Sequence, residues 1–242
     1  MFHDKSFDII SEENSPQYQS IVPILEYIEP IDNGDVLLDP SRISIIIDPL
    51  DATKEFTEEI DDDGTDMLPY VTTLICVVRD EIPIAGIIGR PFKMFPKYEN
   101  EIAEDIMWGV NSDIHGLKIE QPNHITSSIV TISRSHTGNA VDIISHTLNK
   151  ESLLAGGAGY KSLLVLTGKA DAYIHVTAIK TWDLCAGHAL IKAAGGDITD
   201  KDGNQLIYSK GKPKFTNGLI ASLDKNKIKE YASKLKNIEL NT

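Results

Sequence analysis

The stretch IIIDPLDATKEFTE, residues 45–58, decides the fold because it leads from a buried strand into an acidic loop. The β-branched run over residues 42–47 predicts a strand that delivers Asp48 to its end. Pro49 fixes its own φ angle and biases the preceding residue towards an extended conformation. The turn that follows can bring the carboxylates of Asp48 and Asp51 to one side. Magnesium prefers oxygen ligands, so the stretch predicts a metal-binding loop.

Further oxygen atoms could complete such a site. The Leu50 carbonyl lies between the two loop carboxylates, and Glu12 and Glu13 follow an apolar pair. Asp183 stands at the start of a predicted helix over residues 182–194. Each acid also has an ordinary explanation, because Glu12 and Glu13 could be a solvated surface pair, and an acid in the first helical turn usually serves the cap or the helix dipole. Spacing alone does not show that these groups converge.

The composition bounds the class of protein. The chain has 242 residues, which suits one large domain or two closely joined lobes. The hydrophobic fraction of 41% and the charged fraction of 24% are ordinary for a globular protein. The formal net charge of -13 disfavours non-specific binding to nucleic acid or to anionic membranes. We therefore expect no nucleic-acid partner.

Cysteine use and apolar runs bear on the compartment. The two cysteines, Cys76 and Cys185, both lie in apolar runs, so we expect buried free thiols rather than a disulfide framework. No apolar run approaches the length of a membrane span, and residues 1–5 do not resemble a signal peptide. The sequence therefore predicts no targeting or membrane segment within this chain.

The pattern along the chain predicts two lobes. Residues 1–120 are expected to form an α+β lobe with an antiparallel sheet, which includes a hairpin of strands over 70–78 and 84–88. Residues 121–242 alternate strands and helices, which is typical of an α/β lobe. The helices expected in this second lobe cover residues 140–148, 160–166, 182–194 and 225–235.

Two strings place the chain near a known family. Residues 47–58, and residues 182–190 closing on Gly195-Gly196, resemble the two signatures of the inositol monophosphatase-like superfamily of magnesium-dependent, lithium-sensitive phosphatases. Further strings are similar to the branch that removes the 3′-phosphate of adenosine 3′,5′-bisphosphate, and within it to the Golgi-resident form. These strings are TKEFTE at 53–58, SRSH at 133–136, GGAGYK at 156–161 and YIHVT at 173–177.

The resemblance implies a fold and a setting. The family fold is a layered α-β-α-β-α sandwich, like that of sugar phosphatases, with the site between two lobes. Members of the branch carry upstream helices, with an Asp that pairs with the equivalent of Thr53, and the Golgi form also has a membrane anchor. This chain matches from a point inside that domain, so we expect the first helices to be missing and the first lobe to be incomplete at its start. A full-length relative is expected at the Golgi membrane or lumen, and otherwise in the cytoplasm; homodimers occur in the family.

The resemblance also implies residue roles. Two or three Mg²⁺ ions would be bound by Glu12, Asp48, the Leu50 carbonyl, Asp51 and Asp183. Thr53 would orient the attacking water, with Glu12 and Asp51 as its catalytic neighbours and Glu13 as a further acid. The nucleotide would be contacted by Ser133, His136, Gly157 and Lys161.

The expected function is therefore a magnesium-dependent release of the 3′-phosphate from adenosine 3′,5′-bisphosphate, which gives AMP and phosphate. Two alternatives stay open: an inositol monophosphate phosphatase, and a catalytically impaired fragment that binds metal or nucleotide. The glycine-rich string at 156–159 lacks the spacing of a P-loop and could be a tight strand-to-helix turn. His136 could equally be a capping or surface residue.

Overall fold

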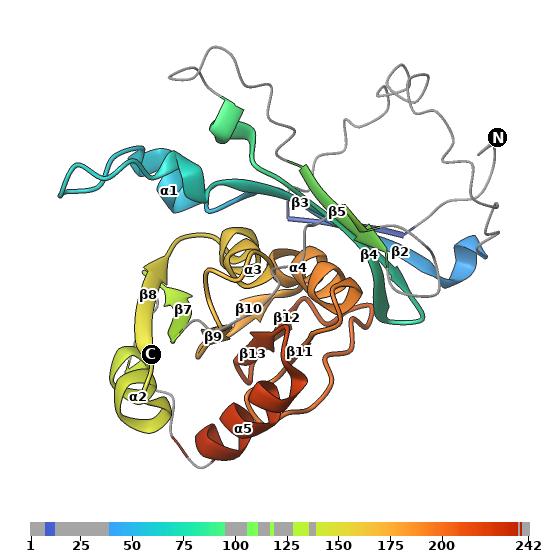
Figure 1. Ribbon diagram of the computed structural model, residues 1–242. Coiled ribbons are helices and arrows are strands. Elements are labelled where there is room, and N and C mark those ends of the chain that lie inside the picture. Colours follow the sequence, from blue (N-terminus) through green and yellow to red (C-terminus); the bar gives the residue numbers. More distant parts are fainter. Residues whose placement is uncertain are drawn as a thin grey trace.

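Two sheets and two groups of helices stack in layers (Figure 1). The computed structural model describes residues 8–12, 39–94, 106–110, 117–118, 128–135, 139–236 and 238. From one side to the other, these residues form a first sheet, a pair of helices, a second sheet and an outer pair of helices. The layered α+β class predicted from the sequence is confirmed, and the described residues supply four of its five expected layers.

The first sheet has the strand order β1-β2-β3-β4-β5-β6. β1 pairs with β2 in parallel, and the other neighbours pair antiparallel. Along β3 buried and half-buried residues alternate, as expected for a strand with one face on the core. The strands are β1 (Asp8–Ser11), β2 (Ile43–Asp51), β3 (Thr72–Arg79), β4 (Ile82–Gly89), β5 (Ile106–Val110) and β6 (Leu117–Lys118).

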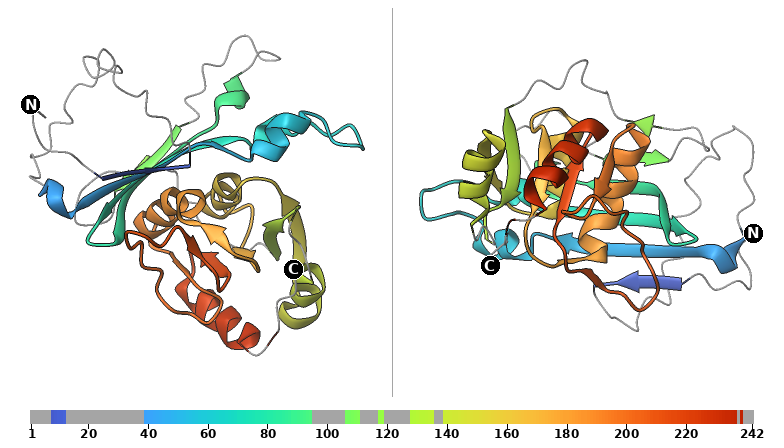
Figure 2. Two further views of the ribbon diagram at one scale, coloured as in Figure 1. Left: turned by 180° about the vertical axis from the view of Figure 1, so that it is seen from behind. Right: turned by 90° about the horizontal axis from the view of Figure 1, so that it is seen from below.

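Helices α3 (Ala158–Leu166) and α4 (Thr181–Ala193) fill the space between the two sheets (Figures 1 and 2). Most residues of both helices are buried, because sheet or helix surrounds them on every side. The helices touch at Gly187, where an added Cβ would lie 2.2 Å from Ser162 Oγ. Only glycine permits this close approach, so Gly187 helps to set the position of α4 and of Asp183 near its start.

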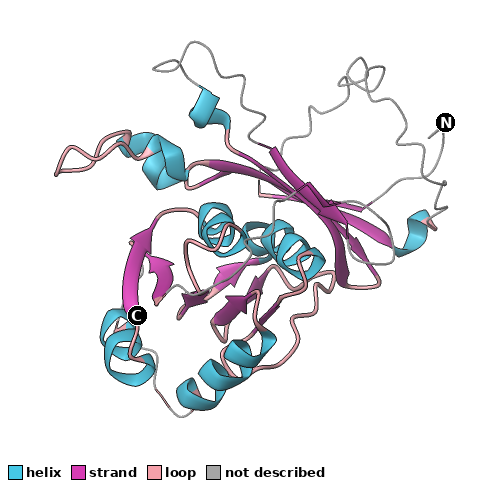
Figure 3. Cartoon of the chain, in the orientation of Figure 1, coloured by secondary structure: helices cyan, strands magenta, loops and turns pink. Residues whose placement is uncertain are grey.

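The second sheet has the order β11-β13-β9-β7-β8 and carries α2 and α5 on its far face (Figure 3). A second core cluster lies between this face and the helices. The strands are β7 (Ile129–Ser133), β8 (Glu151–Ala155), β9 (Ala172–His175), β11 (Asp197–Thr199) and β13 (Leu219–Ser222). The outer helices are α2 (Ala140–Ile143), which continues as a π-helical turn over Ile144–Leu148, and α5 (Lys225–Leu235). A small ribbon pairs β10 (Ile179–Lys180) with β12 (Lys214–Phe215).

The predicted hairpin and the four predicted helices are confirmed to within a few residues. The strand predicted over residues 42–47 instead runs on to Asp51, with a register shift between Asp48 and Asp51. The sequence did not predict four short strands, because each pairs with a strand that is distant in the sequence. These are β1, β10, β11 and β12. The lobe boundary is expected near residue 120, but residues 119–127 lie outside the described part of the chain. The division into lobes therefore stays a prediction.

The expectation of free thiols is wrong. Cys76 on β3 and Cys185 on α4 form a disulfide, with their Cα atoms 5.7 Å apart. Both are buried as expected, at 1% and 0% exposure. The bond leaves no local pattern in the sequence, because 109 residues separate the cysteines and only the packing of α4 on the first sheet brings them together. The bond therefore ties the helix that carries Asp183 to the sheet that carries Asp48.

We expect the native chain, denatured without a reductant, to take up no alkyl group from iodoacetamide, whereas the reduced chain takes up two. Removing the cross-link as the pair Cys76→Ser and Cys185→Ser should lower the free energy of unfolding by about 3–4 kcal/mol, because the bond closes a long loop in the unfolded chain. Mass spectrometry and chemical denaturation measure the two effects. Two alkyl groups on the unreduced chain would restore the expectation of free thiols.

Candidate metal centre

Three carboxylates from distant parts of the chain meet at one end of the first sheet. Candidate ligand atoms of Glu12, Asp48 and Asp183 all lie within 4.8 Å of one another. Glu12 follows β1, and its backbone N–H donates to the Ile47 carbonyl at 3.3 Å. The parallel register of β1 and β2 therefore places Glu12 beside Asp48. The structure thus brings these three acids together, and their role as metal ligands stays a prediction.

Burial makes this cluster electrostatically costly. Asp48 is 1% exposed, and the pKa of its carboxyl is raised by burial and by the charges of Asp51, Glu12 and Asp183. Burial, followed by the charge of Asp51, raises the pKa of Asp183 to about 7. Hydrogen bonds from the Leu50 N–H to Asp48 at 3.1 Å and from the Lys180 N–H to Asp183 at 3.3 Å oppose these shifts only in part. The site therefore has a surplus of negative charge, which a cation would neutralise.

Asp51 lies beside this cluster and is held at the start of α3. Its Oδ2 accepts hydrogen bonds from the Gly159 N–H and from Thr72 Oγ1, both at 2.8 Å, and its Oδ1 accepts one from the Ala158 N–H at 3.2 Å. The carboxylate thus satisfies N–H groups that a helix start leaves unpaired. Sequence reasoning assigned Asp51 to the metal but missed Thr72 and this anchoring to α3.

Thr53 is the first residue of α1 (Thr53–Glu58), the short helix that leaves the metal loop. Its Oγ1 donates a hydrogen bond to the Leu50 carbonyl at 3.0 Å. Ala52, the residue before the helix, has a left-handed backbone with a φ of 71°. The sharp turn at Ala52 and the hydrogen bond to Leu50 fix the Thr53 hydroxyl on the loop that carries Asp48 and Asp51.

The glycine-rich string forms a tight turn against the metal loop. Gly157 has a φ of 59°, and an added Cβ would lie 2.7 Å from the Tyr70 carbonyl and 2.9 Å from Asp51 Oδ2. Lys161 is 3% exposed, and its ammonium donates hydrogen bonds to the carbonyls of Gly157 and Ala155. Burial lowers the pKa of Lys161 to about 8, against the raising effect of nearby carboxylates such as Asp51. The turn therefore supports Asp51, and the Lys161 ammonium points to the backbone of the turn.

Of the remaining residues with a predicted role, the structure describes only some. Ser133 ends β7, and its half-buried hydroxyl accepts a hydrogen bond from the Ser135 N–H at 3.3 Å. His136 and Glu13 lie outside the described residues, so their expected roles stay predictions. Arg134 was not singled out from the sequence, yet it makes ion pairs with acids of α1 and of the turn that follows.

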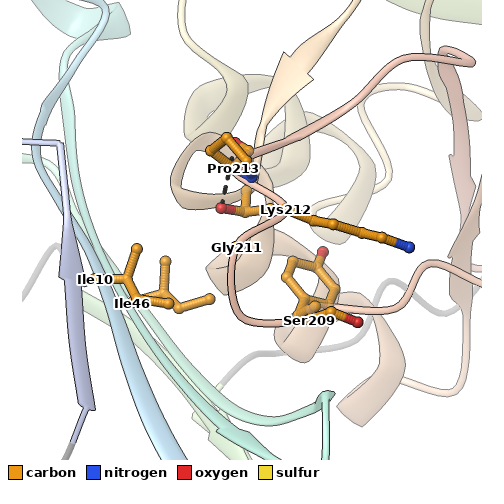
Figure 4. Close-up of a pocket in the computed structure, with 8 residues that line it drawn as sticks. Ile10, Ile46, Ser209, Gly211, Lys212 and Pro213 are labelled. Atoms are coloured by element: carbon orange, nitrogen blue, oxygen red, sulfur yellow. Dashed lines mark hydrogen bonds between the residues drawn. The ribbon is translucent and has the colours of Figure 1, made fainter.

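A cavity of about 300 Å³ lies between the first sheet and the loop over residues 209–213 (Figure 4). Its lining includes Ile10, Ile46 and Thr181, each two residues before one of the three clustered carboxylates. Ile10 and Ile46 face a loop that runs from Ser209 to Pro213. The full lining is Ile10, Ile46, Thr181, Tyr208, Ser209, Gly211, Lys212 and Pro213. This wall is mainly apolar.

The donor set suits a hard divalent cation. All three clustered side chains offer carboxylate oxygens, which favour magnesium, manganese or calcium over softer metals. The raised pKa values of Asp48 and Asp183 indicate that the negative charge at these two residues lacks sufficient compensation from the protein itself. Glu12, Asp48 and Asp183 would hold the ion, and Asp51 and the Leu50 carbonyl lie close enough in the chain to contribute.

Comparison with known proteins identifies relatives. The family model described as "Inositol monophosphatase family" matches residues 3–239. Inositol monophosphatase 3 of Danio rerio is 37% identical over 199 residues, which are 79% of this chain and 53% of that protein. The human Golgi-resident adenosine 3',5'-bisphosphate 3'-phosphatase is 36% identical over 192 residues, which are 76% of this chain and 48% of that protein. The chain thus spans about half the length of these curated relatives.

Solved structures share the fold at low sequence identity. An inositol monophosphatase from Anabaena superposes with a TM-score of 0.63 and 17% identity, covering 97% of this chain and 80% of the other. CysQ from Bacteroides thetaiotaomicron, a bacterial member of the inositol monophosphatase family, gives a TM-score of 0.60 and 20% identity, covering 91% and 79%. These similarities concern the fold.

The raised pKa of Asp183 predicts a pH effect on the metal-free chain. The folded carboxyl keeps its proton up to about pH 7, whereas the unfolded one loses it near pH 4. The stabilising contribution of this proton is therefore complete below about pH 4 and is lost as the pH rises to 7. Asp183→Asn should stabilise the metal-free chain at pH 7.5 by up to about 4 kcal/mol.

Thermal and chemical unfolding at pH 5 and pH 7.5, with a chelator present, measure this effect. Asp80→Asn, in an exposed ion pair with Arg42, is the matched control and should change little. Magnesium at pH 7.5 should stabilise the unsubstituted chain but not Asp183→Asn. An equal pH dependence in the two proteins would show that Asp183 carries no excess charge.

Proposed function

The chain belongs to the inositol monophosphatase family, and we propose that it is a divalent-metal-dependent phosphomonoesterase that acts on adenosine 3′,5′-bisphosphate. Hydrolysis of the 3′-phosphate would give AMP and phosphate. The observation that carries this proposal is the convergence of Glu12, Asp48 and Asp183 at the end of the first sheet. Phosphoryl transfer needs little covalent chemistry from a protein, so a site that concentrates cations next to a positioned hydroxyl has the required parts.

The cluster supplies the electrostatic part of the reaction. Two or three Mg²⁺ ions, when bound, would neutralise phosphoryl oxygens and the leaving oxygen and lower the pKa of a water molecule. Glu12, Asp48, Asp51, Asp183 and the Leu50 carbonyl would hold these ions. Glu12 is the exposed member of the carboxylate cluster, whereas Asp48 is buried, so the open side for the substrate is that of Glu12.

Thr53 supplies the orientation of the attacking water. Because its hydroxyl proton is donated to the Leu50 carbonyl, the lone pairs of Oγ1 are free to accept a hydrogen bond from water. A water held in this way would present its oxygen to the phosphorus atom. Glu12 and Asp51 are the other acids assigned to catalysis.

The substrate is proposed from the relatives and from the nucleotide strings of the sequence. Ser133, His136, Gly157 and Lys161 are assigned to the nucleotide, with Gly157 acting through its backbone. The curated relatives carry both names, an inositol monophosphatase 3 and a bisphosphate 3'-phosphatase, at nearly equal identity. An inositol phosphate is therefore the second candidate substrate, and a fragment that binds metal or nucleotide without turnover is the third reading.

The location is proposed to be an oxidising lumen. Disulfides persist in secretory compartments and are rare in the cytosol, so the bond between Cys76 and Cys185 favours the lumen. The name of the Golgi-resident relatives agrees with this compartment. None of the helices in the described part of the chain is long and apolar enough to cross a membrane. A homodimer stays a proposal.

The substrate test is phosphate release from adenosine 3′,5′-bisphosphate and from inositol 1-phosphate, each with and without magnesium. We expect magnesium-dependent release from the nucleotide at a higher kcat/KM than from the inositol phosphate. Asp183→Asn, which removes a proposed metal ligand, should abolish release from both. Preference for inositol 1-phosphate would favour the second candidate, and no release from either would leave a binding fragment, which calorimetry with nucleotide and magnesium would detect.

Thr53→Ala tests the orientation of water. Loss of one hydrogen-bond acceptor at the nucleophile should lower kcat by about 100-fold. The magnesium concentration that gives half-maximal activity should not change, because Thr53 is not proposed to bind the metal. Thr57→Ala, at another hydroxyl of α1 that donates to the Lys54 carbonyl, is the matched control. Equal kcat values for Thr53→Ala and the unsubstituted chain would exclude this role.

A further inference from the structure

Arg134 connects two parts of the chain that have different roles in the proposed reaction. It directly follows Ser133, at the end of β7, and its backbone N–H donates to the Ala155 carbonyl of β8 at 3.2 Å. Its guanidinium reaches across to α1, the helix that begins with Thr53. The contact therefore connects the segment assigned to the nucleotide with the helix assigned to the water.

The guanidinium binds three carboxylates. Nη1 donates to Glu58 Oε2 at 3.1 Å and to Glu55 Oε1 at 3.5 Å, and Nη2 donates to Asp61 in the turn after α1. The Arg134 side chain is 16% exposed and that of Glu55 is 5% exposed. Ion pairs that are this sheltered from water are worth more than exposed ones, and losing one partner leaves the other uncompensated.

The neighbouring backbone is shaped to admit this contact. At Gly156 an added Cβ would lie 2.6 Å from the Glu55 carboxylate group, so only glycine leaves room for it. No side chain caps the start of α1, where Ala52 has a left-handed backbone. Glu55 and Glu58 lie three residues apart on α1 and would repel each other without a shared cation. Arg134 thus ties α1 to the end of β7.

We infer that Arg134 is a positioning residue, which holds α1 against the Ser133 segment and thereby keeps Thr53 at the place of the attacking water. This inference rests on the proposed function of the site. A planar guanidinium with five donors can serve three carboxylates at once, which a lysine ammonium does less well. Because Arg134 follows Ser133, a nucleotide bound at Ser133 would also restrain α1 through the ion pairs of Arg134.

The test combines kinetics with hydrogen exchange on the full chain with magnesium present. Arg134→Gln should lower kcat by about 10- to 100-fold, since a misplacement of about 1 Å at a reacting group has effects of this size. The magnesium requirement should stay unchanged, and amide exchange should accelerate in residues 53–61 but not in α4. Arg134→Lys should show a smaller loss, and guanidinium ion at millimolar concentration should restore part of the kcat of Arg134→Ala. Arg42→Gln, in an ion pair whose side chains are 58% and 46% exposed, is the matched control and should change neither readout.

Three results would overturn the inference. The first is an unchanged kcat in Arg134→Gln. The second is a rise in KM with unchanged kcat and exchange, which would make Arg134 a substrate ligand. The third is accelerated exchange throughout the chain, which would make it a general stabiliser. If the unsubstituted chain releases no phosphate, the proposed function fails, and amide exchange in residues 53–61 decides the inference alone. Faster exchange confined to these residues in Arg134→Gln would then support the positioning role of Arg134, and unchanged exchange would exclude it.

Discussion

Mutual repulsion among clustered carboxylates, of which Asp48 and Asp51 are buried, is the constraint that shapes the surrounding structure. Glu12, Asp48 and Asp183 are brought within 4.8 Å of one another, and Asp51 lies beside them. Bringing such groups together out of water is unfavourable unless a cation or a proton compensates them. The surrounding fold therefore has to hold in place groups that would otherwise separate. The same surplus charge is what gives the site its affinity for a divalent ion.

Several contacts oppose this repulsion, and each comes from a different layer. The register of β1 on β2 places Glu12, the packing of Gly187 on α3 sets α4, and the disulfide ties α4 to β3. The start of α3 binds Asp51, and Arg134 compensates the acids of α1. Packing of the core offsets the loss of folding stability that the clustered charges cause, as is usual where function requires strained or like-charged groups.

The local features of the site were predictable from the sequence, whereas its long-range contacts were not. The loop from Asp48 to Thr53 and the helix that carries Asp183 follow from proline, β-branched and capping preferences of nearby residues. The short strand β1 makes its pairs more than thirty residues away, and the disulfide spans 109 residues, so neither leaves a local pattern. Arg134 likewise lies more than seventy residues from each of its partners. The spacing of the acids did not predict that they come together at one metal site, and this expectation came from the resemblance to the family.

The claim that these three carboxylates together bind a divalent cation is tested most directly by anomalous diffraction from crystals soaked in Mn²⁺, an ion that shares the oxygen preference of magnesium. We expect an anomalous peak between Glu12, Asp48 and Asp183, with carboxylate oxygens at about 2.0–2.2 Å from it. The Asp183→Asn protein, soaked in the same way, should show a weaker peak or none. A peak elsewhere in the native protein, or no peak at a saturating concentration of the ion, would contradict it.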